Sequence, residues 1–176
     1  MTDDGPSALL GGRFFTAMRE AASVHAIGAS GADAHLAHLL RVTGLVLEDG
    51  GAEDEMIAAL LHHADGDQTD EAARQRDIRT RYGDDVAEIV SVCTDSFNDP
   101  NPSWRARKIE HVRRIEDASP GGVRVSLADS LDHARGLVSR RRDGVGRAGG
   151  PAVDAGMYYA SLARAFSRRL PGPRTA

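Results

Sequence analysis

The segment Ile57-Ala58-Ala59-Leu60-Leu61-His62-His63-Ala64-Asp65-Gly66-Asp67-Gln68 carries the strongest structural signal in the chain. It begins as an apolar run of helical character, ends that run in two histidines, and continues as an acidic turn that contains a glycine. Burying a neutral imidazole without a partner costs free energy, and histidine is the commonest metal-ligating side chain. The segment therefore predicts a core helix that ends at a metal site.

Two further residues are candidates to complete this site. His38 lies in a second amphipathic run, 62 − 38 = 24 residues before His62, and Asp129 lies at the start of a third. A catalytic metal takes protein ligands from several rigid elements and leaves at least one position open for water. Because the three residues stand on separate predicted helices, the hypothesis requires those helices to pack together.

Apolar residues recur at helical spacing through most of the chain, and we find no convincing β-alternation. The spacing predicts up to eight helices, over residues 13–24, 33–48, 53–62, 71–82, 86–93, 104–118, 123–139 and 155–170. In the sixth of these, we expect Trp104, Ile109, Val112 and Ile115 to face the core. We expect Pro120-Gly121-Gly122 to form a turn.

Composition limits the class of protein. With 176 residues, 41% hydrophobic and 27% charged, the chain is long enough for one domain with its own core. We expect a helical domain at residues 12–170, with flexible tails at 1–11 and 171–176. A net charge of −4 gives no argument for nucleic acid or membrane partners. A single cysteine, no signal pattern and no long apolar run favour a soluble, cytoplasmic protein of unknown oligomeric state.

Several motifs, taken together, resemble one family. They are Ala58-Ala59-Leu60-Leu61-His62, Arg81-Tyr82-Gly83-Asp84-Asp85-Val86-Ala87-Glu88-Ile89-Val90, Trp104-Arg105-Ala106-Arg107-Lys108, Leu127-Ala128-Asp129 and Met157-Tyr158-Tyr159. They are similar to motifs of the HD-domain metal phosphohydrolases, in the branch of the RelA/SpoT-type guanosine polyphosphate hydrolases and their small stand-alone bacterial members. The resemblance covers most of the chain and implies an all-α, single-domain, HD-type helical bundle.

The resemblance also implies roles for individual residues. His38, His62 and Asp129 match the family's metal ligands, and His63 stands where the family has the aspartate of the His-Asp pair. Asp67 matches the second member of the catalytic Glu-Asp pair, and Asp65 is a candidate substitute for the first. The residues that match substrate-binding positions are Arg107, Lys108, Arg135 and, less directly, His133, with Arg105 as a weaker phosphate contact.

Four departures from the family pattern bear on activity. His63 replaces the aspartate, Gly66 replaces the glutamate, His133 replaces an asparagine, and the family's Gln-x-Arg-Lys segment is absent after His25. The missing segment argues against guanosine tetraphosphate as the substrate more than it argues against the fold. With one carboxylate in place of two, a divalent ion keeps a charge of +1, and nitrogen ligands favour Zn, Fe, Co or Ni over Mn. We therefore expect a divalent transition metal that is not the family's usual Mn²⁺, or one that is bound more weakly.

Three interpretations of function follow. The leading one is a metal-dependent phosphohydrolase-like protein that acts on a nucleotide polyphosphate or another small phosphorylated metabolite. The second is a hydrolysis-deficient relative that binds or senses such a ligand, and the third is an enzyme recruited to a biosynthetic tailoring reaction. Structural roles are the ordinary alternative for single residues: solvated charge for Arg107 and Lys108, core packing for Trp104, Tyr158 and Tyr159, and structural or exposed positions for His25, His35 and His111.

Overall fold

Helices account for all the regular structure in the residues that the computed structural model describes, which are 10–25, 32–62, 71–94, 103–142 and 152–170. The eight helices are α1 (Gly12–His25), α2 (Ala32–Glu48), α3 (Glu53–Leu61), α4 (Glu71–Tyr82), α5 (Asp84–Cys93), α6 (Trp104–Asp117), α7 (Pro120–Arg142) and α8 (Ala152–Arg169). The prediction of an all-α fold is confirmed. The expected tails lie largely outside the described residues, and the domain boundaries stay a prediction.

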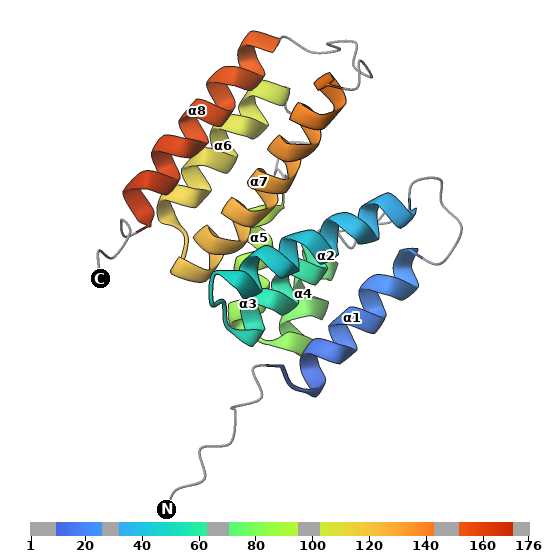
Figure 1. Cartoon of the computed structure of the whole chain (residues 1–176). Coiled ribbons are helices and arrows are strands. Elements are labelled where there is room, and N and C mark those ends of the chain that lie inside the picture. The colour runs from blue at the N-terminus through green and yellow to red at the C-terminus, as the bar shows by residue number, and fades with distance from the viewer. Residues whose placement is uncertain (1–9, 26–31, 63–70, 95–102, 143–151, 171–176) are drawn as a thin grey trace, which may run out of the picture.

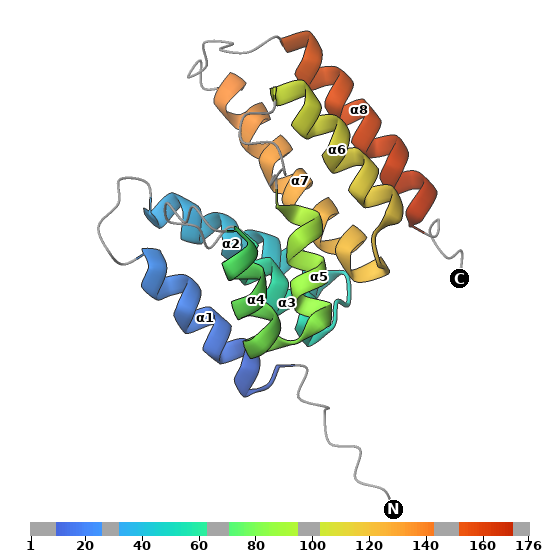
Figure 2. The ribbon, with the colours of Figure 1, turned by 180° about the vertical axis from the view of Figure 1, so that it is seen from behind.

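The helices form two groups that share α7 (Figures 1 and 2). Helices α1 to α5 surround one apolar core, which the first half of α7 completes with Val125 and Ala128. Helices α6, α7 and α8 enclose a second core around Ile115, Leu162 and Phe166. Among the described residues, no helix combines the length and the apolar character that crossing a membrane requires.

Helix α3 is the centre of the first group. It packs against α1, α2, α5 and α7, and every residue from Glu55 to Leu61 is buried. A short helix that is apolar on all sides is stable only where neighbours cover it completely. The Met56–Leu61 run meets this condition, and it delivers His62, at the end of the helix, to a fully buried position.

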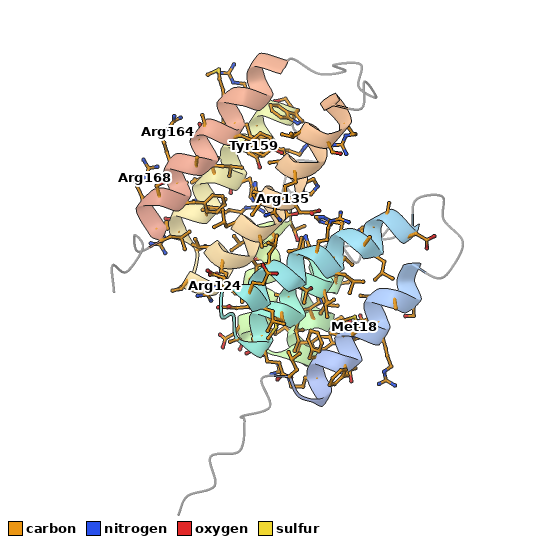
Figure 3. All side chains as sticks on the ribbon, in the orientation of Figure 1. Met18, Arg124, Arg135, Tyr159, Arg164 and Arg168 are labelled. Carbon is orange, nitrogen blue, oxygen red and sulfur yellow. The ribbon has the colours of Figure 1, made fainter. Side chains whose placement is uncertain are left out.

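A buried carboxylate fixes the start of α3. The Oε2 atom of Glu55 accepts a hydrogen bond from the backbone N–H of Ala52 at 3.1 Å, and Arg124 on α7 donates to both carboxylate oxygens at 2.7 and 2.5 Å. Arg124, labelled in Figure 3, also donates to Asp49 at 2.8 Å. The turn between α2 and α3 is thereby bonded to α7, the helix that carries Asp129.

Helix α7 begins earlier than the sequence predicts. Pro120-Gly121-Gly122 is its first turn rather than a separate turn. Proline is well suited to the first helical position, and the hydroxyl of Ser119 accepts a hydrogen bond from the Gly122 N–H at 3.1 Å. A Cβ atom at Gly121 would lie 2.9 Å from Oε1 of Glu55, so this glycine allows α7 to approach α3 closely.

The expected inward face of α6 is wrong at two positions. Ile109 is 63% exposed and Trp104 is 38% exposed. His111 and Ile115, one turn apart, are the buried residues of this helix. Ile109 is two residues from His111, which is about 200° around an α-helix, so it faces away from α8 and α7.

The tight turn before α3 generates a prediction about stability. A Cβ atom at Gly51 would lie 2.5 Å from Cγ1 and 2.8 Å from the backbone oxygen of Val46. We expect Gly51→Ala to lower the free energy of unfolding by about 1–3 kcal/mol, as overpacking does. Gly44→Ala is the matched control, because no atom lies within 4 Å of its added Cβ in α2. The control should be more stable than wild type by about 0.5–1 kcal/mol, because alanine is the better helix former.

Urea unfolding followed by circular dichroism measures both differences. Equal stability of Gly51→Ala and wild type would contradict the close packing described for this turn.

Candidate metal centre

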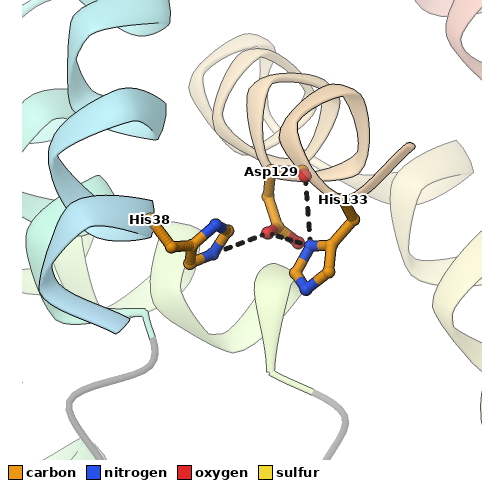
Figure 4. A group of neighbouring side chains, drawn as sticks. All are labelled: His38, Asp129 and His133. Atoms are coloured by element: carbon orange, nitrogen blue, oxygen red, sulfur yellow. Dashed lines mark hydrogen bonds and ion pairs between the residues drawn. The ribbon is translucent and has the colours of Figure 1, made fainter. Parts of the chain in front are cut away.

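Three helices meet at the carboxylate of Asp129. Its Oδ1 atom lies 3.2 Å from Nε2 of His38 on α2 and 3.5 Å from Nε2 of His62 at the end of α3. The side chain of His62 is fully buried, and those of Asp129 and His38 are only 9% and 12% exposed. Figure 4 shows His38 and Asp129 facing each other across the gap between α2 and α7. The structure thus brings together the three residues that the sequence analysis placed on separate helices.

Hydrogen bonds assign the tautomers of both rings. Nδ1 of His62 lies 2.8 Å from the backbone oxygen of Ala59, and Nδ1 of His38 lies 2.7 Å from Oδ2 of Asp132. A carbonyl or carboxylate oxygen only accepts, so each Nδ1 must donate. In a neutral ring, each Nε2 then presents its lone pair toward Oδ1 of Asp129. Two lone pairs and an anionic oxygen converge, and such a centre is stabilised by a cation.

The distances suit a metal ion as that cation. With bonds of about 2.1 Å and ligand angles of about 90° to 110°, neighbouring ligand atoms lie about 3.0–3.4 Å apart. The separations of 3.2 and 3.5 Å around Oδ1 of Asp129 are close to this range. Each of these histidines therefore fits a divalent transition metal shared with Asp129, both in donor type and in its distance from that carboxylate.

Asp129 is held in the anionic form that a metal ligand requires. Burial opposes its ionisation, but the hydrogen bond from His133 and the nearby rings of His38 and His62 outweigh burial and hold the pKa of Asp129 well below its ordinary value. His133 shows the reciprocal effect, because its hydrogen bond to Asp129 raises the pKa of the imidazole.

Asp132 bonds the second ring nitrogen of His38, a role that the sequence did not predict. Its buried carboxylate accepts the Nδ1–H bond of His38 and two bonds from Arg41, at 2.6 and 3.0 Å. The hydrogen bond from Arg41 is the main cause that lowers the pKa of Asp132. Metal-ligating histidines commonly donate their other N–H to a carboxylate in this way. The available signal was its position three residues after Asp129, on the same face of a helix.

Of the remaining candidate residues, some lie in the part of the chain that the structure describes and others lie outside it. His133 is on α7, one turn after Asp129, and its Nδ1 atom lies 2.9 Å from Oδ1 of Asp129. Arg135 is exposed on the same helix (Figure 3), and the ammonium of Lys108 on α6 lies 5.2 Å from the centre of the Tyr158 ring. The phosphate-binding roles of Arg107, Lys108 and Arg135 stay predictions. The candidates His63, Asp65 and Asp67 lie outside the described residues.

The other aromatic and histidine candidates in the second group of helices have structural partners. His111 is buried and hydrogen-bonds the Tyr158 hydroxyl at 2.7 Å and the Ser126 hydroxyl at 3.2 Å. Tyr159 is half-buried, and burial together with the negative charge of Asp129 raises its pKa. His111 and Tyr158 therefore hold α6, α7 and α8 together, as the structural interpretation expected.

Comparisons with known proteins agree with this fold. The HD domain family profile matches residues 17–164, which is most of the chain. A metazoan ortholog of SpoT, described as hydrolysing ppGpp and as having a role in starvation responses, has a similar structure: TM-score 0.65 and 20% identity, over 94% of this chain and 89% of that one. The crystal structure of lmo0812 from Listeria monocytogenes EGD-e gives a TM-score of 0.62 and 21% identity, over 77% of this chain and 90% of that one. A search of curated proteins gives no match.

The contact between His38 and Asp132 generates a prediction. Asp132→Asn weakens the acceptor for Nδ1 of His38, so we expect metal affinity to fall by about 10- to 100-fold. Asp77→Asn is the matched control, because Asp77 is an exposed carboxylate that pairs with Arg81 on α4. Isothermal titration with Zn²⁺ and Co²⁺ measures both variants. Unchanged affinity in Asp132→Asn would show that Asp132 does not support a metal ligand.

Proposed function

Because the chain belongs to the HD domain family, we propose that it is a metal-dependent phosphohydrolase that acts on a nucleotide polyphosphate or another small phosphorylated metabolite. The observation that carries the proposal is the convergence of His38, His62 and Asp129 on one buried point. A divalent cation would satisfy two imidazole lone pairs and a carboxylate oxygen that face one another in a buried site.

The chain's own residues divide the work of hydrolysis. A divalent ion, when bound, supplies Lewis-acid activation of the attacking water and offsets the charge of the phosphate. His38 and His62 would be its nitrogen ligands, and Asp129 would be the anionic ligand that balances part of its charge. In the proposed arrangement Asp67, with Asp65 as an alternative, orients the water, while Arg107, Lys108 and Arg135 contact phosphate oxygens.

The substrate class is proposed more broadly than for the SpoT ortholog. That protein is described as hydrolysing ppGpp. This chain lacks the Gln-x-Arg-Lys segment that the RelA/SpoT-type hydrolases use near the guanine nucleotide, and it has histidine and glycine at positions 63 and 66. We therefore include nucleoside polyphosphates and small phosphate esters beside guanosine tetraphosphate in the class to be tested.

Loss of the carboxylate at the centre should abolish activity. The test is a screen of guanosine tetraphosphate, nucleoside triphosphates and sugar phosphates for phosphate release, with Mn²⁺, Fe²⁺, Co²⁺ or Zn²⁺ added. Asp129→Asn should remove the bound metal and lower kcat/KM by on the order of 10³-fold or more, because metal activation supplies several kcal/mol and each 1.36 kcal/mol is tenfold in rate. Asp77→Asn should keep both metal and turnover.

Turnover that survives both chelation and Asp129→Asn would refute the proposal. Metal-dependent binding of a phosphorylated compound without turnover would identify the chain as a hydrolysis-deficient binding protein instead.

Restoring the family's acidic residues gives a second test of the same chemistry. The double variant His63→Asp with Gly66→Glu reinstates the carboxylates that the family uses at these positions. We expect phosphate release to rise by at least about tenfold, because a positioned acid or base typically contributes about 10²- to 10⁴-fold. Each single variant serves as a control, and stopped assays with the best substrate of the screen measure the change. Equal rates for the double variant and wild type would mean that the pocket has diverged beyond these two residues.

A further inference from the structure

His133 is the third histidine with a ring nitrogen close to Oδ1 of Asp129. Its Nδ1 atom lies 2.9 Å from that oxygen and 3.2 Å from the backbone oxygen of Asp129, and its ring centre lies 4.7 Å from that of His38. The potential ligand atoms of His38, Asp129 and His133 all lie within 4.8 Å of one another. Figure 4 shows the ring of His133 beside the carboxylate, on the side away from α2.

We propose that a bound ion displaces the Nδ1 proton of His133 to solvent, so that His133 becomes a direct ligand of the metal and α7 supplies two ligands from adjacent turns. The proposal replaces the substrate contact expected from the sequence, and it rests on the metal centre of the proposed function. It concerns a position where the RelA/SpoT-type hydrolases have asparagine, so it gives this chain a ligand set of its own.

The spacing of the two residues on α7 supports ligation. Asp129 and His133 are four residues apart and therefore lie on one face of the helix. The same i, i+4 spacing lets two histidines of one helix bind a single zinc ion in the His-Glu-x-x-His motif. The 2.9 Å between Nδ1 and Oδ1 is close to the edge of about 3.0 Å expected for two ligands at 90°.

Exposure gives His133 a distinct place among the ligands. Its side chain is 51% exposed, whereas those of His38, His62 and Asp129 are nearly or fully buried. Three ligands therefore form the floor of the centre, and His133 stands at its solvent side. His133 would also bring the number of ligands to four, which the family reaches with an aspartate at the position of His63.

The donor set has a consequence for metal selectivity. With His133, the described ligands are three imidazole nitrogens and one carboxylate oxygen. Such a set favours Zn²⁺, Fe²⁺, Co²⁺ or Ni²⁺ over Mn²⁺ and Mg²⁺, which prefer oxygen. Loss of one nitrogen should reduce the preference for Zn²⁺ over Mn²⁺.

The alternative role for His133 is to orient Asp129. In that case Nδ1–H donates a hydrogen bond to the carboxylate and never binds the metal. The variant His133→Asn separates the two roles, because an asparagine side-chain N–H can still donate to Asp129, but the imidazole is gone. Leu137→Asn is the matched control, one turn further along α7 and 41% exposed.

X-ray absorption of the Zn²⁺-loaded full-length protein counts imidazole ligands, and competition titration gives the Zn²⁺ and Mn²⁺ affinities. We expect one imidazole fewer in His133→Asn, Zn²⁺ affinity lower by about 10-fold or more, and a smaller change for Mn²⁺. Leu137→Asn should match wild type, and thermal unfolding without metal should be similar for all three proteins.

The outcomes that overturn the inference are distinct from failure of the proposed function. An unchanged imidazole count and Zn²⁺ affinity in His133→Asn, with metal still lost in Asp129→Asn, would remove His133 from the ligand set and leave the centre intact. Absence of stoichiometric metal from wild type in every loading condition would remove both the inference and the centre on which it rests.

Discussion

The burial of an imidazole at the end of α3 is the constraint from which the arrangement of the other helices follows. Helix α3 is covered on all sides, so His62 enters the interior with it. A buried polar ring requires partners, and Asp129 can be one of them only if α7 crosses close to the end of α3. Gly121 permits that approach, and the bonds between Glu55 and Arg124 hold it. The candidate metal centre and the packing of the first helix group therefore depend on the same contacts.

The chemistry of the centre depends on how the polar groups are layered. Asp129 and the two histidines are nearly free of contact with water, so their charges and lone pairs act on one another at low effective dielectric constant. Behind them, Asp132 and Arg41 fix the direction of the His38 ring. Such support makes a ligand set rigid before any ion arrives, which is a general requirement for precise catalytic geometry.

The sequence predicted the helices well, because apolar spacing, glycines and prolines are local signals. It also predicted that His38, His62 and Asp129 would meet, because their spacing matched a known pattern. It did not reveal Asp132, since a carboxylate one turn from a ligand is indistinguishable from a solvated charge until Arg41 and His38 are seen around it. Apolar character alone predicts Ile109 inward, and the Pro-Gly-Gly sequence at Pro120 predicts a turn although proline suits a first helical turn. These errors all concern tertiary contacts or helix ends.

The position of α7 between the two helix groups has a mechanical consequence. Asp129, Asp132 and His133 lie on one helix, so a shift of α7 as a whole does not change the distances between them. Such a shift does change their distances to His38 and His62, because those two residues belong to α2 and to the end of α3. Helices α6 and α8 pack against the same helix at Val123 and Leu127. A shift of the second helix group would therefore move Asp129, Asp132 and His133 together relative to His38 and His62.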